Sequence, residues 1–213
     1  MAVVARRREP LERLAAELTK IGPTAHAITA DLSDTAAIGQ LAERIRATVG
    51  TLDALYYGPT PDTGFVPAEA LTAERVRDYM PLAVDALIGL VREFLPPMLE
   101  QGDGAILSGQ GASAVRGLPN MSGPGPAQAA QRNYLQSLGA EVSARGVYVG
   151  RLYIGAAIEK TPFHAELLAA KAADDQTWAM PTVAPEHLAD LLWTMHTTRT
   201  RSEETYPEGL FTG

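Results

Sequence analysis

Three hydroxyl side chains stand at or just after the ends of apolar runs, and each could act on a carbonyl group. Tyr57 closes the run 52–57, Ser108 closes the run 104–108, and Ser113 follows in a loop rich in glycine, serine and proline. A tyrosine hydroxyl can transfer a proton, and a serine hydroxyl can orient a carbonyl oxygen. Each also has a structural alternative. Tyr57 would pack in the core or the wall of a cleft, and either serine would satisfy nearby backbone groups.

Composition narrows the classes of function. The chain has 213 residues, a net charge of −7 at pH 7 with histidine neutral, and no cysteine. The acidic balance argues against nonspecific nucleic-acid binding, and the lack of cysteine excludes disulfides, zinc-thiolate sites and cysteine nucleophiles. The four histidines have no metal-like spacing, so we predict no metal site.

The chain shows no membrane or export signal. No apolar run approaches the length of about 18 residues needed to cross a bilayer. The first apolar residues reach Arg6 too soon for a signal peptide, whose charges precede its apolar part. We therefore expect a cytoplasmic protein with no membrane partner.

Short apolar runs alternate with helical patterns along the chain. Strands are expected at 2–5, 25–30, 52–57, 104–108 and 147–154, with a further terminal strand at 206–211. Helical spacing of apolar residues fills the intervals, including one long helical region at 72–99 that carries Pro81, and another at 127–145. This alternation predicts an α/β protein with a doubly wound, mostly parallel sheet, formed by residues 1–213 as a single domain.

Several short motifs in this order resemble the short-chain dehydrogenase/reductase family. The segment 104–128 has the frame of that family's active-site region, in which a strand, a Gly-Leu-Pro-like turn and a helix follow one another. The other matches are Ala5-Arg6-Arg7, Ala30-Asp31-Leu32, Leu52-Asp53-Ala54-Leu55, Phe94-Leu95-Pro96-Pro97-Met98 and the segment 141–148. The resemblance implies a Rossmann-like fold and a nicotinamide dinucleotide cofactor.

The same resemblance implies where the cofactor would bind. Arg6 and Arg7 stand where the family reads the adenosine ribose, in a pattern similar to NADP-preferring members, in which arginine pairs with the 2′-phosphate. The alternative is a solvated basic start of a helix. Asp31, followed by Leu32, would hold the adenine, or would cap a helix.

Two glycines complete the implied cofactor site. Gly58 lies in the wall that faces the cofactor, where Tyr57-Gly58 begins the replacement of the family's Asn-Asn-Ala-Gly. Gly155 keeps the glycine that follows the fifth strand and cradles the nicotinamide.

Two departures from the family pattern stand out. The N-terminal glycine motif that receives the cofactor phosphates is missing, and the chain begins at the family's second strand. We expect either that roughly thirty residues are missing upstream, the size of one βαβ step, or that the chain is rearranged to close the gap. The absent strand would lie between this chain's first and third strands.

The second departure is catalytic. The positions of the family's Ser, Tyr and Lys hold Gly111, Pro124 and Gln128.

These observations lead to a hypothesis and two alternatives. The hypothesis is an NADP(H)-dependent oxidoreductase of an unknown carbonyl or alcohol, preferring NADP over NAD and lacking the usual catalytic residues. The alternatives are a non-catalytic ligand-binding or assembly protein on the same scaffold, and a non-redox isomerase or dehydratase. The resemblance also implies a homodimer or homotetramer, assembled through the helical regions 72–99 and 127–145.

Overall fold

The chain folds as an α/β structure in which all paired strands run parallel. The structure, a computed structural model, describes residues 1–59, 64–172 and 180–211. Its largest sheet has the strand order β3-β4-β5-β8, formed by Ala54–Tyr57, Gly104–Gly111, Val147–Ile154 and Glu203–Tyr206. The long strands β4 and β5 pair along their whole length, with Ser108 opposite Arg151 and Gly111 opposite Ile154. The parallel sheet predicted from the sequence is confirmed.

A second, two-stranded sheet is formed by β1 (Ala2–Ala5) and β2 (His26–Thr29), joined by helix α1 (Arg8–Ile21). Within the described residues, β1 pairs only with β2, and β3 only with β4. The break in pairing thus falls between the chain's first and third strands, the place where the sequence analysis expected a strand to be absent.

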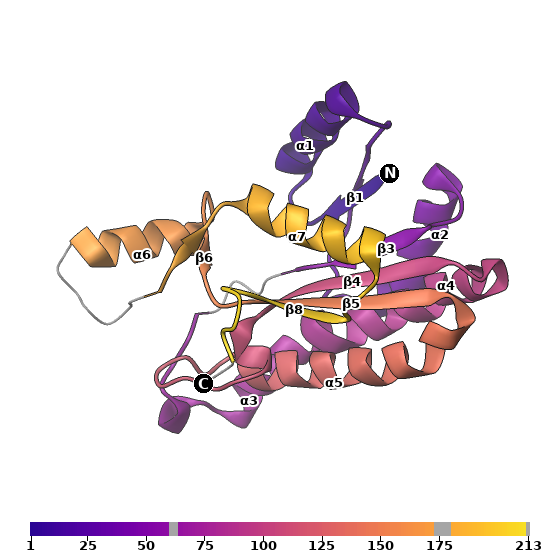
Figure 1. The fold of residues 1–213 in the computed structure, drawn as a ribbon. Helices are drawn as coiled ribbons and strands as arrows, with labels where there is room; N and C mark the ends of the chain where they lie inside the picture. The colour runs from indigo at the N-terminus through magenta and orange to yellow at the C-terminus, as the bar shows by residue number, and fades with distance from the viewer. Residues whose placement is uncertain (60–63, 173–179, 212–213) are drawn as a thin grey trace.

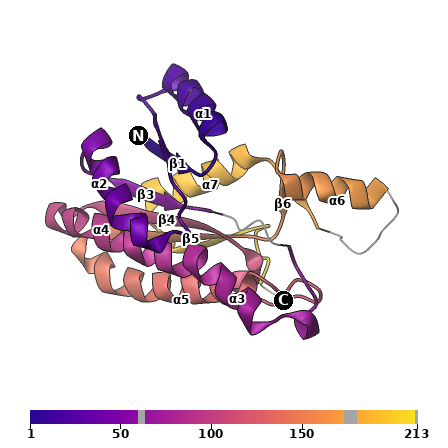
Figure 2. The same ribbon diagram turned by 180° about the vertical axis from the view of Figure 1, so that it is seen from behind.

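Helices cover both faces of the main sheet, which makes the fold doubly wound (Figures 1 and 2). One face packs against α2 (Ile38–Val49), α4 (Ala86–Gln101) and α5 (Gly125–Val142) in a core that includes Leu87, Leu135 and Ile106. The other face packs against α7 (Pro185–Thr198), through Leu188 and Met195 on Ala105 and Leu107. Alternating strand residues supply the two cores because successive side chains point to opposite faces.

The long helical region around Pro81 is divided in the structure. Helix α3 (Ala73–Met80) begins at Thr72, whose hydroxyl accepts a hydrogen bond from the Arg75 amide, and a π-helical segment η3 (Pro81–Asp85) leads into α4. Proline has no amide hydrogen to donate to the preceding turn, which explains why the regular α-helix ends there.

Two other elements differ from the sequence-based boundaries. Strand β4 continues past Ser108 to Gly111, and the last strand is Glu203–Tyr206 rather than 206–211. Beyond the main sheet, β6 (Ala157–Ile158) pairs with β7 (Thr182–Val183), and helix α6 spans Pro162–Ala172. No helix in the described part of the chain is long and apolar enough to cross a membrane.

Candidate functional site

The residues predicted to face a cofactor all follow the carboxyl ends of strands. Arg6 and Arg7 follow β1, Asp31 and Leu32 lie two and three residues after β2, Gly58 follows β3, and Gly155 follows β5. In open parallel sheets, ligands bind outside the carboxyl ends of the strands. Parallel strand direction therefore carries these side chains to the carboxyl edges of the two sheets.

At the ends of β1 and β2, Arg6 and Asp31 are electrostatic neighbours. The Asp31 carboxylate accepts hydrogen bonds from the Ser33 hydroxyl at 2.7 Å and the Ser33 amide at 2.9 Å. These bonds, and after them the charge of Arg6, lower the pKa of Asp31 below its ordinary value. Asp31 thus fixes the turn after β2 and stays ionised, while Leu32 packs against the main core. Arg7 occupies the N-cap position of α1 without a capping side-chain bond.

Ser108 lies beneath helix α5 rather than at the strand ends. It is fully buried, and its hydroxyl accepts from Gln131 Nε2 at 3.1 Å and Gln110 Nε2 at 3.4 Å. The Gln110 side-chain oxygen, also buried, has no hydrogen-bond partner in the described part of the chain. The geometry gives Ser108 a place in a polar cluster between β4 and α5.

Ser113 lies beside the start of α5, next to Gln128, which occupies the position that the family frame gives to its lysine. The Ser113 hydroxyl donates to Gln128 Oε1 at 2.8 Å. A Cβ atom added to Gly111 would lie 3.0 Å from the same oxygen and 3.4 Å from the Ser113 hydroxyl. Gly111, Ser113 and Gln128 therefore form one neutral corner, able to donate and accept hydrogen bonds but without a group that titrates near neutral pH.

The Tyr57 side chain lies in the core on the α4 side of the sheet. Its side chain is buried, and its hydroxyl donates to the backbone carbonyl of Leu82 in η3. Burial raises the pKa of Tyr57 well above its ordinary value. This placement corresponds to the packing alternative considered for Tyr57 from the sequence.

Tyr56, the preceding residue of β3, was not a candidate from the sequence, and its side chain points to the opposite face of the sheet. A Cβ atom on Gly58 would be 2.4 Å from the Tyr56 hydroxyl, and one on Gly109 would be 2.8 Å from it. The hydroxyl thus lies against Gly58, which follows β3, and against Gly109, which lies within β4 two residues before its end. The signal in the sequence was the tyrosine pair itself, because strand alternation sends the two rings to opposite faces.

Gly155 is covered by the chain after β8. Its amide donates to the Tyr206 carbonyl at 2.7 Å, and a Cβ atom there would lie 2.6 Å from a methyl carbon of Leu210. The position of β8 therefore decides how closely Leu210 approaches the predicted nicotinamide contact.

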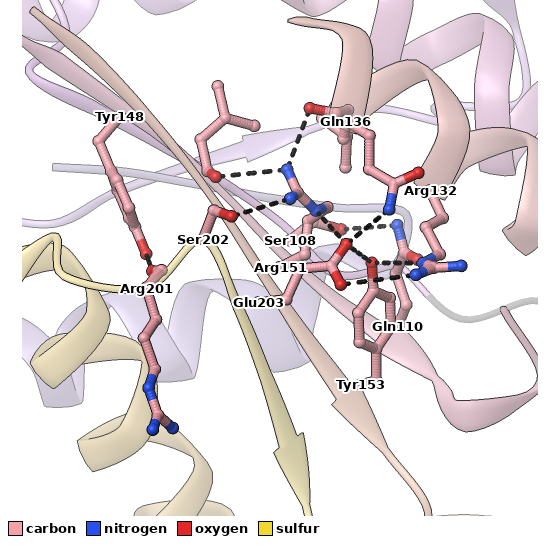
Figure 3. A network of polar contacts seen from close by, with 12 residues as sticks. Ser108, Gln110, Arg132, Gln136, Tyr148, Arg151, Tyr153, Arg201, Ser202 and Glu203 are labelled. Atoms are coloured by element: carbon pink, nitrogen blue, oxygen red, sulfur yellow. Dashed lines mark hydrogen bonds and ion pairs between the residues drawn. The ribbon is translucent and has the colours of Figure 1, made fainter. Parts of the chain in front are cut away.

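An ion pair across the sheet holds β8 in register with β5. Figure 3 shows the Arg151 guanidinium and the Glu203 carboxylate pointing toward one another, with an Nε to Oε1 distance of 3.1 Å. Arg151 is 4% exposed and also donates to the Leu135 carbonyl and the Ser202 hydroxyl. A buried charge is tolerated when it is paired and hydrogen-bonded in this way.

Glu203 is the acceptor shared by this network. Gln136 Nε2 donates to it at 2.9 Å and the Tyr153 hydroxyl at 3.1 Å, and Arg132 lies 3.5 Å away. Burial by itself would raise the pKa of Glu203, but these hydrogen bonds and the two arginine charges outweigh it and lower that pKa. Burial raises the pKa of Tyr153 to about 12. The network joins α5, β5 and β8 into one unit.

A doubly wound parallel sheet with ligand-facing residues at its strand ends defines a Rossmann-like protein. The chain belongs to the short-chain dehydrogenase family, since the family's model, described as short chain dehydrogenase, matches residues 1–172.

Relatives by sequence are dehydrogenases and reductases. The chain is 28% identical over 141 residues to a 2-dehydro-3-deoxy-L-rhamnonate dehydrogenase (NAD(+)) of a Sphingomonas species, covering 66% of this chain and 56% of the relative. It is 27% identical over 193 residues to a fatty acyl-CoA reductase of Acinetobacter baylyi, covering 89% and 62%. The chain thus spans less than two thirds of the length of each of these relatives.

Solved structures confirm the fold. A gluconate 5-dehydrogenase from Burkholderia cenocepacia, in complex with NADP and tartrate, superposes with a TM-score of 0.80 at 17% identity, covering 100% of this chain and 85% of that one. An NADPH-bound short chain oxidoreductase from Pseudomonas aeruginosa, described as containing an atypical catalytic center, gives a TM-score of 0.79 at 21% identity, covering 95% and 82%.

Proposed function

We propose that this chain is an oxidoreductase that binds a nicotinamide dinucleotide, prefers NADP(H) over NAD(H), and interconverts a carbonyl compound and an alcohol. The observation that carries the proposal is that Arg6, Asp31, Gly58 and Gly155 each follow the carboxyl end of a parallel strand. Membership of the family supports it. So do relatives named as dehydrogenases and reductases, and fold neighbours with bound NADP and NADPH.

The residues present fit such a cofactor in part. The Arg6 cation beside Asp31 suits an anionic group on the adenosine ribose, and arginine is well suited to phosphate. The Tyr56 hydroxyl packs against Gly58, a predicted cofactor contact, and against Gly109. When bound, the cofactor would supply or accept a hydride. The chain's own residues would hold the cofactor, exclude water, and donate or accept the proton.

The experiment that tests this function is the oxidation of NADPH with a panel of aldehydes and ketones, followed by the loss of absorbance of the reduced nicotinamide. The proposal expects turnover with at least one carbonyl compound and a lower rate with NADH. No oxidation with any compound would contradict it.

A second candidate is a non-catalytic ligand-binding protein on the same scaffold. It is favoured by the neutral corner at Gly111, Ser113 and Gln128, which has no group that can act as acid or base near pH 7. This candidate predicts ligand binding with no product from any substrate. Product formed without cofactor consumption would instead support an isomerase or dehydratase.

We also propose that the chain forms a homodimer or homotetramer through the helical regions 72–99, which contains α3 and most of α4, and 127–145, which contains most of α5. The exposed positions Ala129, Asn133, Ser137 and Ala140 of α5 carry small side chains at helical spacing, which allows close approach of a second copy. Light scattering at micromolar concentration tests this, and a monomer would contradict it.

A further inference from the structure

Strand β2 has one edge paired with β1 and one edge that is open. On the paired edge, the His26 amide donates to the Met1 carbonyl at 2.9 Å. Within the part of the chain that the structure describes, β2 pairs with no strand besides β1. The amide and carbonyl of one strand residue point to the same edge, and successive residues point to opposite edges. Ala25, Ala27 and Thr29 therefore direct their backbone groups away from β1.

Two of these outward groups are already bonded within the chain. The Ala25 amide donates to Thr19 Oγ1 at 3.0 Å, and the Thr29 carbonyl accepts from Arg44 Nη1 at 3.3 Å. The Ala25 carbonyl, the Ala27 amide and carbonyl, and the Thr29 amide make no hydrogen bond among residues 1–59, 64–172 and 180–211. Unpaired groups on a strand edge are a template for the addition of another strand.

A hollow of about 510 Å³ lies beside this open edge. It is lined by residues 25–28 and by Arg44, Ala47 and Thr48 of α2. The alanine and threonine side chains that line it are short. The strand His26–Thr29 also contains no proline or lysine, the residues that often keep other chains away from a sheet edge. The hollow thus leaves room for an incoming chain alongside β2.

The free backbone groups match those of a second copy of the same strand. In an antiparallel pair, residues directly opposite each other exchange both N–H···O bonds, and such pairs recur at every second residue. When Ala27 lies opposite Ala27 of a second copy, the two residues exchange both bonds. Ala25 then lies opposite Thr29 of the second copy, and the Thr29 amide meets the Ala25 carbonyl. Every free outward group of both copies is paired.

The two groups that are bonded within the chain also fit this arrangement. The Ala25 amide and the Thr29 carbonyl would face each other in the antiparallel pair, and they are the groups that Thr19 and Arg44 already satisfy. A strand of unrelated sequence would have groups of its own opposite these two, and those groups would be left without partners. The pattern of free and occupied groups therefore favours a second copy over a foreign strand.

We propose that the open edge of β2 is an interaction surface for a second copy of this chain, with the two strands antiparallel around a twofold axis at Ala27. The surface is isologous, because each copy presents the same groups to the other. It joins the two-stranded sheets of two chains into one continuous sheet. It involves neither of the helical regions 72–99 and 127–145, and it does not depend on the proposed oxidoreductase function.

The first test is amide hydrogen exchange of the wild-type chain, followed by NMR from low to high micromolar protein concentration. The Ala27 and Thr29 amides should exchange more slowly as the concentration rises, by a factor of roughly ten or more once the pair forms. The His26 and Ile28 amides point to β1, so their protection should not depend on concentration. Ala27 and Thr29 amides that exchange at the unprotected rate throughout would overturn the proposal.

A second test uses the lack of cysteine in the chain. Opposed residues of a hydrogen-bonded antiparallel pair have Cα atoms about 5.5 Å apart, within the range that a disulfide spans. Ala27→Cys should therefore form a cross-linked dimer under mild oxidation at micromolar concentration. Ala68→Cys, at an exposed alanine of the short helix η2 (Ala68–Ala70), is the matched control and should not cross-link. Equal cross-linking of the two variants would contradict the proposal.

A third test removes the amide at the axis. Ala27→Pro deletes an outward amide and no bond to β1, and proline is tolerated on a strand edge whose amide faces solvent. Light scattering should give about half of the wild-type mass, because one twofold interface is lost. Circular dichroism checks that the variant is folded, and an unchanged mass in the folded variant would overturn the proposal. If the variant does not fold, the exchange and cross-linking results decide.

Discussion

The hydroxyl of Tyr56 lies where a side chain on Gly58 would have to be, since a Cβ atom at residue 58 would come within 2.4 Å of that oxygen. The two residues are separated along the chain by Tyr57, whose ring points to the other face of the sheet. At the end of β3, the lack of a side chain on Gly58 therefore leaves the space that the Tyr56 hydroxyl fills.

Gly58→Ala should push the Tyr56 ring out of its place. The contact is with the far end of a half-exposed side chain, so we expect a loss of stability of less than about 1 kcal/mol, below the usual cost of overpacking a core. With tyrosines labelled with ¹³C at Cζ, the NMR signal of Tyr56 should shift in this variant even without ligand. In a Tyr56→Ala background the substitution should cost nothing, and a double-mutant cycle that shows no coupling would contradict the contact.

Tyr57→Phe should destabilise the fold. It leaves the Leu82 carbonyl without its tyrosine donor, and we expect a loss of about 1 kcal/mol in the free energy of unfolding, measured with urea. Unchanged stability would mean that water replaces the hydroxyl at no cost.

The raised pKa of Tyr57 also predicts that the stability of the fold falls at high pH. Its pKa is raised in the folded state, so the unfolded chain loses this proton first, near the ordinary value of about 10. The stabilisation is therefore fully present below about pH 10 and declines above it. The wild-type melting temperature should fall more steeply above pH 10 than that of Tyr57→Phe.

Glu203→Gln should loosen β8 from β5. The substitution removes the negative charge that Arg151, Arg132 and Tyr153 share, and we expect a loss of roughly 1–3 kcal/mol because buried donors lose their acceptor. Glu186→Gln is the matched control, because its partner Lys160 is exposed and surface pairs contribute little. Equal effects of the two substitutions would contradict the network's role.

The lowered pKa of the Glu203 carboxylate predicts that the fold loses stability in acid. The pKa of Glu203 is lowered in the folded state, so its stabilisation is complete above the ordinary pKa of about 4.3 and is lost as pH falls through the lower folded value. Wild-type stability should therefore drop more steeply below about pH 4.3 than that of Glu203→Gln. Parallel acid profiles would show that another group controls this range.

Arg6→Ala should reduce the preference for NADPH over NADH. A charge-assisted hydrogen bond contributes about 1.5–3 kcal/mol, which corresponds to a roughly ten- to hundredfold change in relative affinity. Arg13→Ala removes the same charge from an exposed pair on α1 and serves as the control. An unchanged preference would assign Arg6 to the solvated start of α1.

Much of the scaffold could be predicted from periodicity. The strand 147–154 and the helices that flank it follow from apolar spacing, and the positions of Arg6, Asp31 and Gly155 after strands follow from strand direction. Local sequence patterns failed to predict the bounds of elements that depend on contacts with residues far away in the chain. The last strand is Glu203–Tyr206 because it pairs with β5, where Arg151 lies opposite Glu203, 52 residues away in the chain.

The different environments of Tyr56 and Tyr57 show the same limit. Sequence alone singled out Tyr57 because it ends the apolar run. The structure shows that the Leu82 carbonyl, 25 residues further on, takes the Tyr57 hydroxyl, while Gly109 of another strand makes room for Tyr56. Both contacts are tertiary, so the pattern within residues 52–57 could not separate them.

The most direct test of the central claim is a fluorescence titration of the 213-residue chain with NADPH and with NADH. We expect saturable binding of NADPH, weaker binding of NADH, and a smaller difference between the two in Arg6→Ala. Absence of binding by either cofactor would contradict the claim that the ends of these strands form a dinucleotide site.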